Sequence, residues 1–148
     1  MTVTKYTTLL VRDGAKRYDI TTASNPADSA RVFCDMFHAD SLPTESMWQL
    51  CLNSKLSVVG AFCIGQGGVT SCAVDVASIA RNALLCGAYA VTLAHNHPSG
   101  NTAPSREDIA TTRQVKQALN LFNITLCDHV IIGQDGAYHS MRECGEIF

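Results

Sequence analysis

Residues 88–108 are AYAVTLAHNHPSGNTAPSRED, and this stretch decides which fold the chain can adopt. Ala88 to Ala94 form a continuous apolar run, which is typical of a central strand covered on both faces. A loop containing proline and glycine then leads to Ser105, where apolar residues begin to recur at helical spacing as far as about Phe122. A buried strand followed by a loop and a helix predicts an α/β fold.

The flanking sequence predicts further elements around this unit. Caps and apolar residues at helical spacing predict two more helices, over residues 26–38 and 76–86. Runs typical of strands cover residues 44–52, 56–64, 124–126, 130–132 and 138–141. We therefore expect one compact α/β domain over residues 25–148, with a mixed β-sheet flanked by helices. An N-terminal hairpin extension over residues 1–24 is expected to precede it.

Length and composition limit the class of protein. The chain of 148 residues fits a single domain. It has no apolar stretch of about 18 residues and no secretory signal, so we expect a cytoplasmic protein that does not contact a membrane. Seven scattered cysteines without a Cys-x-x-Cys pair disfavour a disulfide framework. The formal charge of −2, with dispersed basic residues, indicates no basic stripe for nucleic acid.

Two histidines at the end of the predicted central strand have the spacing of metal ligands. Residues i and i+2 of an extended chain face the same side, so His95 and His97 can contact one ion while Asn96 points away. Pro98 favours this arrangement, because the residue before a proline disfavours the helical region. For a His-x-His pair alone, surface or substrate-contacting side chains are the simpler interpretation.

Asp108, near the start of the predicted helix, has two interpretations. Ser105-x-x-Asp108 resembles a capping box, in which both side chains satisfy free backbone amides. The same aspartate can also join His95 and His97 in a metal site, which is the interpretation we favour. Two imidazoles and a carboxylate suit Zn²⁺, and three protein ligands leave a fourth position free, as in catalytic sites. One zinc ion per chain and metal-assisted hydrolysis are therefore predicted.

A hydrolytic zinc site also needs a group that takes a proton from water. Glu45 is the best candidate in the sequence, because a carboxylate at the start of a strand beside the central strand could overhang the ion. Spacing alone makes an exposed glutamate at a strand end the simpler interpretation.

The motif resembles the JAMM motif of JAB/MPN metalloproteases. That motif is His-x-His, ten further residues and then aspartate, with a serine three positions before the aspartate, as at His95, His97, Ser105 and Asp108. Three longer strings resemble the RadC-like branch of the family in particular: LAHNHPSG at 93–100, PSREDI at 104–109 and DHVIIG at 128–133. The similarity runs from about residue 25 to the C-terminus.

This resemblance implies a JAB/MPN fold similar to that of cytidine deaminases, and it assigns roles to the residues. His95, His97 and Asp108 would bind zinc, Glu45 would act as general base and acid, and Ser105 would steady the water and the oxyanion. The bond cleaved would be an amide or isopeptide in a protein or peptide. Deamination is disfavoured, because the H-x-E and P-C-x-x-C ligands of that chemistry are absent.

The chain departs from RadC-like proteins in two places. Residues 1–24 are too short for the helix-hairpin-helix segment that suggests DNA binding in full-length relatives. Residues 74–78 are VDVAS where relatives often have VHPRE, so charged substrate contacts are expected to differ. A DNA-associated repair or mobile-element protein and a non-catalytic partner-binding module are therefore the alternatives. A partner-binding module is favoured only if Glu45 lies far from the metal ligands, and a homo-oligomer is compatible with every alternative.

Two further residues have competing interpretations. His129 either lines the cleft or is a hydrogen-bonded histidine at the start of a strand, and we favour the second. Trp48 is expected to pack in the sheet.

Overall fold

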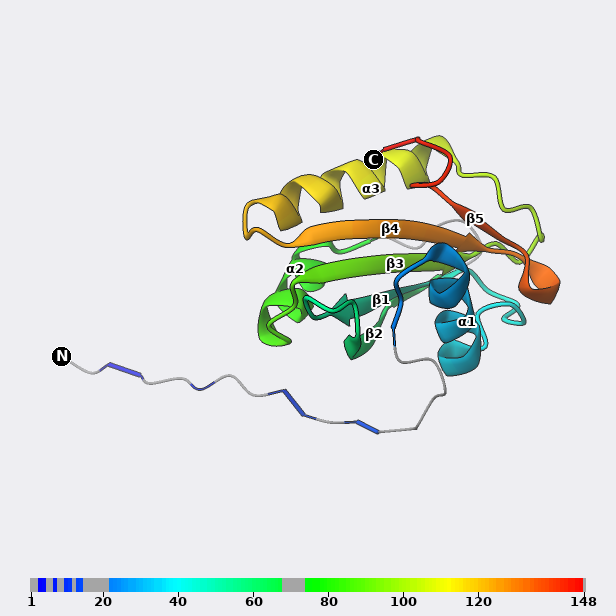
Figure 1. Ribbon diagram of the computed structural model, residues 1–148. Coiled ribbons are helices and arrows are strands. Elements are labelled where there is room, and N and C mark those ends of the chain that lie inside the picture. The colour runs from blue at the N-terminus through cyan, green and yellow to red at the C-terminus, as the bar shows by residue number, and fades with distance from the viewer. Residues whose placement is uncertain are drawn as a thin grey trace.

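The computed structural model describes residues 22–67 and 74–147, together with residues 3, 4, 7, 10, 11, 13 and 14. Most of the hairpin predicted over residues 1–24 lies outside the described residues. The described parts form a mixed sheet of five strands with helices on both faces, which confirms the predicted fold class (Figure 1).

The strands of the sheet follow the order β2-β1-β3-β4-β5. β3 and β4 are parallel and are joined through a helix, whereas the other neighbouring pairs are antiparallel. The strands are β1 (Ser46–Leu52), β2 (Val58–Gln66), β3 (Ala90–Asn96), β4 (Thr125–Ile132) and β5 (Tyr138–Ser140). The helices are α1 (Pro26–Phe37), α2 (Val76–Leu85) and α3 (Arg106–Asn120), with a short 3₁₀ helix η1 (Gln134–Gly136).

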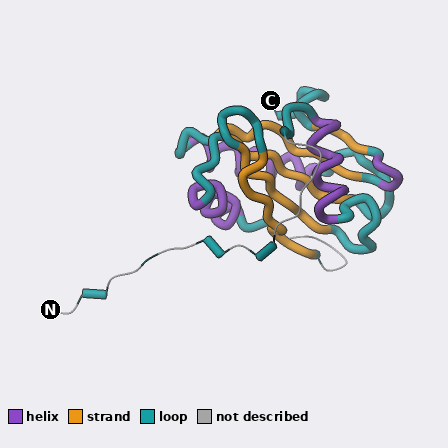
Figure 2. Tube along the Cα trace, turned by 60° about the horizontal axis from the view of Figure 1, so that its bottom comes forward, coloured by secondary structure: helices purple, strands orange, loops and turns teal. Residues whose placement is uncertain are grey.

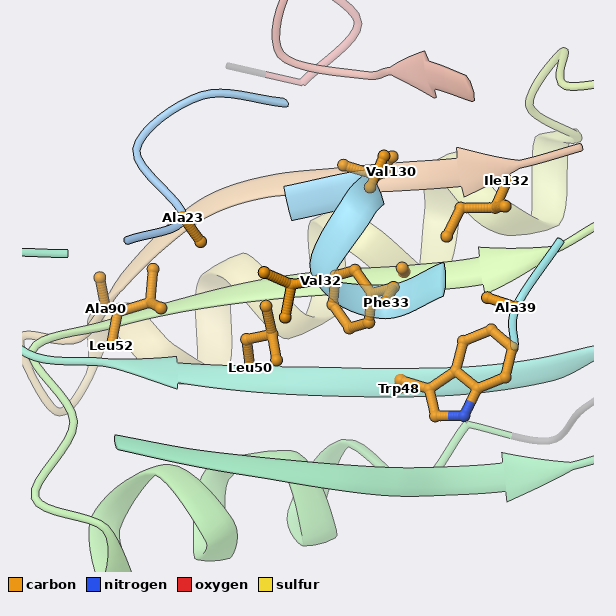
Figure 3. Packing of buried hydrophobic residues seen from close by; sticks show 12 residues of the cluster. Ala23, Val32, Phe33, Ala39, Trp48, Leu50, Leu52, Ala90, Val130 and Ile132 are labelled. Atoms are coloured by element: carbon orange, nitrogen blue, oxygen red, sulfur yellow. The ribbon is translucent and has the colours of Figure 1, made fainter. Parts of the chain in front are cut away.

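Two apolar layers hold the helices against the sheet, and Figure 2 shows the strands between helices on either side. Side chains alternate along β1, so Trp48 and Leu50 join the layer with α1, whereas Met47 joins the layer with α2 and α3. Figure 3 shows Phe33 of α1 on the same side of the sheet as Trp48 and Leu50. Trp48 is 1% exposed and stacks on Phe37, so it is a core residue, as predicted.

Side-chain caps determine where α1 and α2 begin. The Asn25 side chain accepts a hydrogen bond from the Asp28 amide at 2.8 Å, and Pro26 lies in the first turn of α1. Asp75 accepts from the Ala77 amide at 3.0 Å. A hydrogen bond from Ser78 lowers the pKa of the Asp75 carboxyl, as expected for a cap that works in its charged form. Residues 75–78 therefore begin a helix in this chain.

Several element boundaries differ from the sequence prediction. β1 begins at residue 46 rather than 44, and β2 spans 58–66 rather than 56–64, because Leu56 has a φ of 59° and belongs to the turn. β3 continues to Asn96, so His95 lies inside the strand. α3 ends at residue 120 rather than 122.

The largest difference is that β4 is one continuous strand, whereas the sequence predicted two pieces separated by a polar break. Asp128 and His129, in the middle of β4, are 3% and 1% exposed. Ser140 Oγ donates to Asp128 at 2.6 Å, and Thr112 Oγ1 lies 2.5 Å from His129 Nδ1. Because these partners come from β5 and α3, the polar centre of the strand is satisfied by contacts that are distant in sequence.

Neither a membrane-spanning helix nor a disulfide is present in the parts of the chain that the structure describes. No described helix is both long and apolar enough to cross a bilayer. The six cysteines among the described residues are free thiols. Burial raises the pKa of the Cys34 thiol to about 11, which makes it a poor nucleophile at neutral pH.

Candidate metal centre

The predicted ligands meet at the carboxyl end of β3, on the right in Figure 1. His95 is near the end of β3, His97 follows the strand, and Asp108 lies in the first turn of α3. β1 runs antiparallel to β3 with Met47 opposite His95, so Glu45 reaches the same end of the sheet. One ligand atom from each of these four side chains lies within 4.8 Å of the others, and the group could hold a metal ion.

The spacing of the donor atoms fits a tetrahedral ion. The Nε2 atoms of His95 and His97 are 2.9 Å apart. Asp108 Oδ1 lies 3.3 Å from His95 Nε2, and Asp108 Oδ2 lies 3.6 Å from His97 Nε2. Tetrahedral ligands about 2.0–2.1 Å from zinc are about 3.4 Å from one another, so the three groups need little movement to share one ion.

His97 is oriented by the loop that follows it. Its Nδ1 lies 2.6 Å from the main-chain oxygen of Asn101. A carbonyl only accepts hydrogen bonds, so the proton is on Nδ1 and the Nε2 lone pair faces Asp108. The Asp108 carboxylate, whose Oδ2 lies 3.6 Å from Nε2, raises the pKa of His97, because its negative charge stabilises the imidazolium that forms when the ring takes up a second proton.

The capping-box interpretation of Asp108 is confirmed, and the same carboxylate lies beside His95 and His97. Its Oδ2 accepts hydrogen bonds from the Ser105 amide and hydroxyl, each at 2.7 Å, and the Ser105 hydroxyl accepts from the Asp108 amide at 3.0 Å. This capping box holds the carboxylate and leaves Oδ1 facing His95. Burial raises the pKa of Asp108, but the neighbouring His95 and His97 and the hydrogen bond from Ser105 outweigh it and hold the pKa well below its usual value.

We expect Ser105→Ala to lower the free energy of unfolding by about 1 kcal/mol, because the N-cap of α3 is lost. Urea denaturation in the presence of a chelator measures the cap separately from any effect of metal. Ser105→Thr keeps the hydroxyl and is expected to stay close to wild type. Equal stability of Ser105→Ala and wild type would show that the capping box does not stabilise the helix.

Asn96, between the two histidines, was expected only to point away from the metal. Its side chain holds the segment that carries Glu45: Oδ1 accepts from the Ser46 amide at 2.8 Å, and Nδ2 donates to the Thr44 carbonyl at 3.1 Å. The Glu45 carbonyl in turn accepts from the Gly67 amide at 2.7 Å. The backbone of Glu45 is therefore fixed on both sides, which suits a carboxylate that must stay over the site.

His129 contributes to the lining of the hollow that contains the candidate ligands, which is the interpretation that the sequence analysis did not favour. Its Nε2 lies 2.8 Å from His95 Nδ1, so it is hydrogen-bonded, but in the middle of β4 rather than at its start. Burial, and next the neighbouring His95, hold the pKa of His129 well below its usual value, so the imidazole is neutral. In the parallel pairing of β3 with β4, His129 lies opposite Leu93, and Leu93 is two residues before His95. This pairing was the signal that could have revealed the contact between His129 and His95.

The group lies in a surface hollow of about 310 Å³, and a second hollow of about 390 Å³ adjoins it at His97. Glu45, Met47, Val74 and Thr111 line the first hollow together with the candidate ligands. The donor atoms are therefore open to a ligand, and a chain passing over His97 would contact both hollows.

The loop after His97 rests on Gly133, at the end of β4. A Cβ at residue 133 would lie 2.8 Å from the Gly100 carbonyl oxygen and 2.8 Å from Thr102 Cγ2. We expect Gly133→Ala to displace this loop, to cost roughly 1–3 kcal/mol of stability and to weaken metal binding. Thermal unfolding and zinc titration measure both effects. Gly14→Ala, where a Cβ meets nothing within 4 Å, is the control. Unchanged zinc affinity in Gly133→Ala would show that the loop tolerates the contact.

Comparison with known proteins agrees with this geometry. The model of the RadC-like JAB domain matches residues 23–146. A UPF0758 protein of Porphyromonas gingivalis is 43% identical over 104 residues, which are 70% of this chain and 46% of that protein. A UPF0758 protein of Roseiflexus castenholzii is 33% identical over 141 residues, which are 95% of this chain and 58% of that protein.

The chain therefore belongs to the RadC-like JAB domain family, as its motifs predicted. The aligned part of the chain spans about half the length of these curated relatives.

Proposed function

We propose that the protein is a zinc-dependent metallopeptidase or isopeptidase that hydrolyses an amide bond in a protein or peptide. The observation that carries the proposal is that Glu45 lies within 4.8 Å of the candidate ligand atoms of His95, His97 and Asp108. A carboxylate that close to a three-ligand site is what metal-assisted hydrolysis requires. The same proximity disfavours a module that only binds a partner.

The donor set favours zinc over harder cations. Two imidazole nitrogens suit zinc, whereas magnesium and calcium prefer sites made of oxygen ligands. Three protein ligands also leave room for water or substrate, which distinguishes a catalytic zinc site from a structural one. When bound, the ion would lower the pKa of water and polarise the scissile carbonyl.

The side chains around the ion would handle the proton and the charge. Glu45 would take a proton from the attacking water as the C–O bond forms, and it would give that proton to the leaving amine nitrogen as the C–N bond then breaks. Ser105 holds Asp108 in the structure, where its hydroxyl donates to Oδ2. As substrate binds, we propose that this hydroxyl turns to the developing oxyanion.

The test is cleavage of a defined probe by the full chain loaded with zinc. We would incubate it with a library of proteome-derived peptides and with peptides joined through a lysine isopeptide bond, and identify new amine ends by mass spectrometry. The proposal predicts cleavage that a chelator stops and added zinc restores. Zinc held at the site without any cleavage would contradict the proposed hydrolase. Steeply salt-dependent binding to DNA would then support the DNA-associated alternative.

A further inference from the structure

We infer that His129 and Thr112 form a positioning relay, which keeps a proton on Nδ1 of His95 and thereby directs the Nε2 lone pair at the metal. The inference rests on the proposed metal site, because the lone pair needs an ion to bind. It assigns a role in metal binding to His129 and Thr112, which lie outside the ligand motif.

The relay consists of three short contacts in the interior. His129 Nε2 lies 2.8 Å from His95 Nδ1, and His129 Nδ1 lies 2.5 Å from Thr112 Oγ1. Thr112 Oγ1 lies 2.6 Å from the main-chain oxygen of Asp108, one turn earlier in α3. Thr112 is fully buried and His129 is 1% exposed, so water does not compete for these contacts.

Counting protons fixes the direction of the first two bonds. The two contacts of Thr112 Oγ1, to Asp108 O and to His129 Nδ1, each need one proton. The carbonyl has none and the hydroxyl has one, so the imidazole must supply the other. Met141 Sδ lies 3.7 Å from the hydroxyl, but a thioether is a much weaker acceptor than a carbonyl at 2.6 Å. The hydroxyl therefore donates to Asp108 O, and His129 Nδ1 donates to the hydroxyl.

The same count then fixes His95. His129 is 1% exposed and hydrogen-bonds only to an imidazole and a hydroxyl, so the uncharged ring is the form that suits this interior. Its single N–H is the one used toward Thr112, and its Nε2 can only accept. The proton between the two imidazoles must come from His95 Nδ1. A neutral His95 with its proton on Nδ1 presents a bare Nε2, which faces Asp108 Oδ1 at 3.3 Å.

Both histidines thus present the same nitrogen to the site. His97 is fixed by the Asn101 carbonyl and His95 by the relay, so the neutral rings direct two Nε2 lone pairs at one point beside the Asp108 carboxylate. The two Nε2 atoms are 2.9 Å apart, so a cation can be held between them and the carboxylate, as expected of a site prepared for a metal. The relay also ends on the main chain of Asp108, so one residue of α3 supports two of the candidate ligands.

The position of the proton can be measured without metal. Long-range ¹H–¹⁵N spectra of the chelator-treated, ¹⁵N-labelled chain at neutral to mildly basic pH distinguish the two imidazole tautomers. We expect the proton of His95 on Nδ1 and that of His129 on Nδ1. A proton on Nε2 of His95 in the wild-type chain would overturn the inference, whatever the zinc affinity.

Matched variants test whether the relay acts on the metal site. Thr112→Val removes the hydroxyl at nearly constant shape and should mix the tautomers and weaken zinc binding by about 10–100-fold. Thr112→Ser keeps the hydroxyl and should rescue both properties. His129→Gln can accept from His95 and donate to Thr112, so it should bind zinc within a few-fold of wild type, whereas His129→Leu should not.

These outcomes separate the relay from the proposed function. Equal losses of zinc affinity in Thr112→Val and Thr112→Ser, or in both His129 variants, would overturn the relay. A merely structural role would make the two variants of each residue behave alike. If Thr112→Val does not fold, the wild-type spectrum and the comparison of His129→Gln with His129→Leu still test the relay. A wild-type chain that binds no zinc would overturn the proposed function, while its tautomer spectrum would still test the proton position.

Discussion

Glu45→Gln is expected to slow amide hydrolysis by about 10²- to 10⁴-fold, which is the usual contribution of general acid–base catalysis. Glutamine has the size of glutamate but cannot take a proton from water. The backbone at this position is held by Asn96 and Gly67, so the substitution should leave the segment in place. Zinc affinity should stay within a few-fold of wild type, because Glu45 acts on water rather than as a ligand in the proposed mechanism.

Cleavage rates on the most responsive library peptide, measured with saturating zinc, give the effect of Glu45→Gln. Glu143→Gln changes an exposed glutamate that belongs neither to the candidate ligand group nor to the lining of the hollow, and it serves as the matched control. A Glu45→Gln variant as active as wild type would exclude this side chain as the base. A variant that loses zinc as well would indicate that Glu45 is a fourth ligand.

His97→Ala is expected to weaken zinc binding by about 100-fold or more. A four-ligand zinc site contributes roughly 10–16 kcal/mol in total, so one ligand contributes about 3 kcal/mol. Competition with a chromogenic chelator measures the affinity directly. His38→Asn removes an imidazole at the exposed C-cap of α1 and should bind zinc like wild type. Equal affinity of His97→Ala and wild type would place the ion elsewhere.

The same loss should be visible in stability. A ligand that binds only the folded state at about 100 times its Kd stabilises that state by about 2.7 kcal/mol. Zinc should therefore raise the unfolding temperature of wild type and of His38→Asn. At the same zinc concentration, the unfolding temperature of His97→Ala should rise much less. Magnesium in place of zinc should have little effect on any of them.

Local patterns explain how much of this site could be predicted from the sequence. The two-residue period of a strand brings His95 and His97 to one side, and a helix that starts after a short loop returns Asp108 to them. The helix caps at Asn25, Asp75 and Ser105 are equally local, so they were predicted from a few adjacent residues.

What the sequence did not predict depends on contacts between distant segments. Asp128 and His129 suggested a break in β4, because their partners Ser140 and Thr112 become neighbours only in the folded chain. Asn96 showed no sign of holding the segment around Glu45, since that contact follows from the pairing of β1 with β3. Polar residues inside strands are where local pattern fails, because their burial depends on the tertiary structure.

The central claim is that His95, His97 and Asp108 hold one zinc ion beside Glu45. Crystals of the zinc-loaded chain, with diffraction recorded on both sides of the zinc absorption edge, test it most directly. We expect one anomalous peak per chain, about 2.0–2.2 Å from the Nε2 atoms of both histidines and from a carboxylate oxygen of Asp108. The Glu45 carboxylate should lie one water molecule away. A peak bound by other side chains, or the absence of a peak although zinc is in excess, would contradict the account.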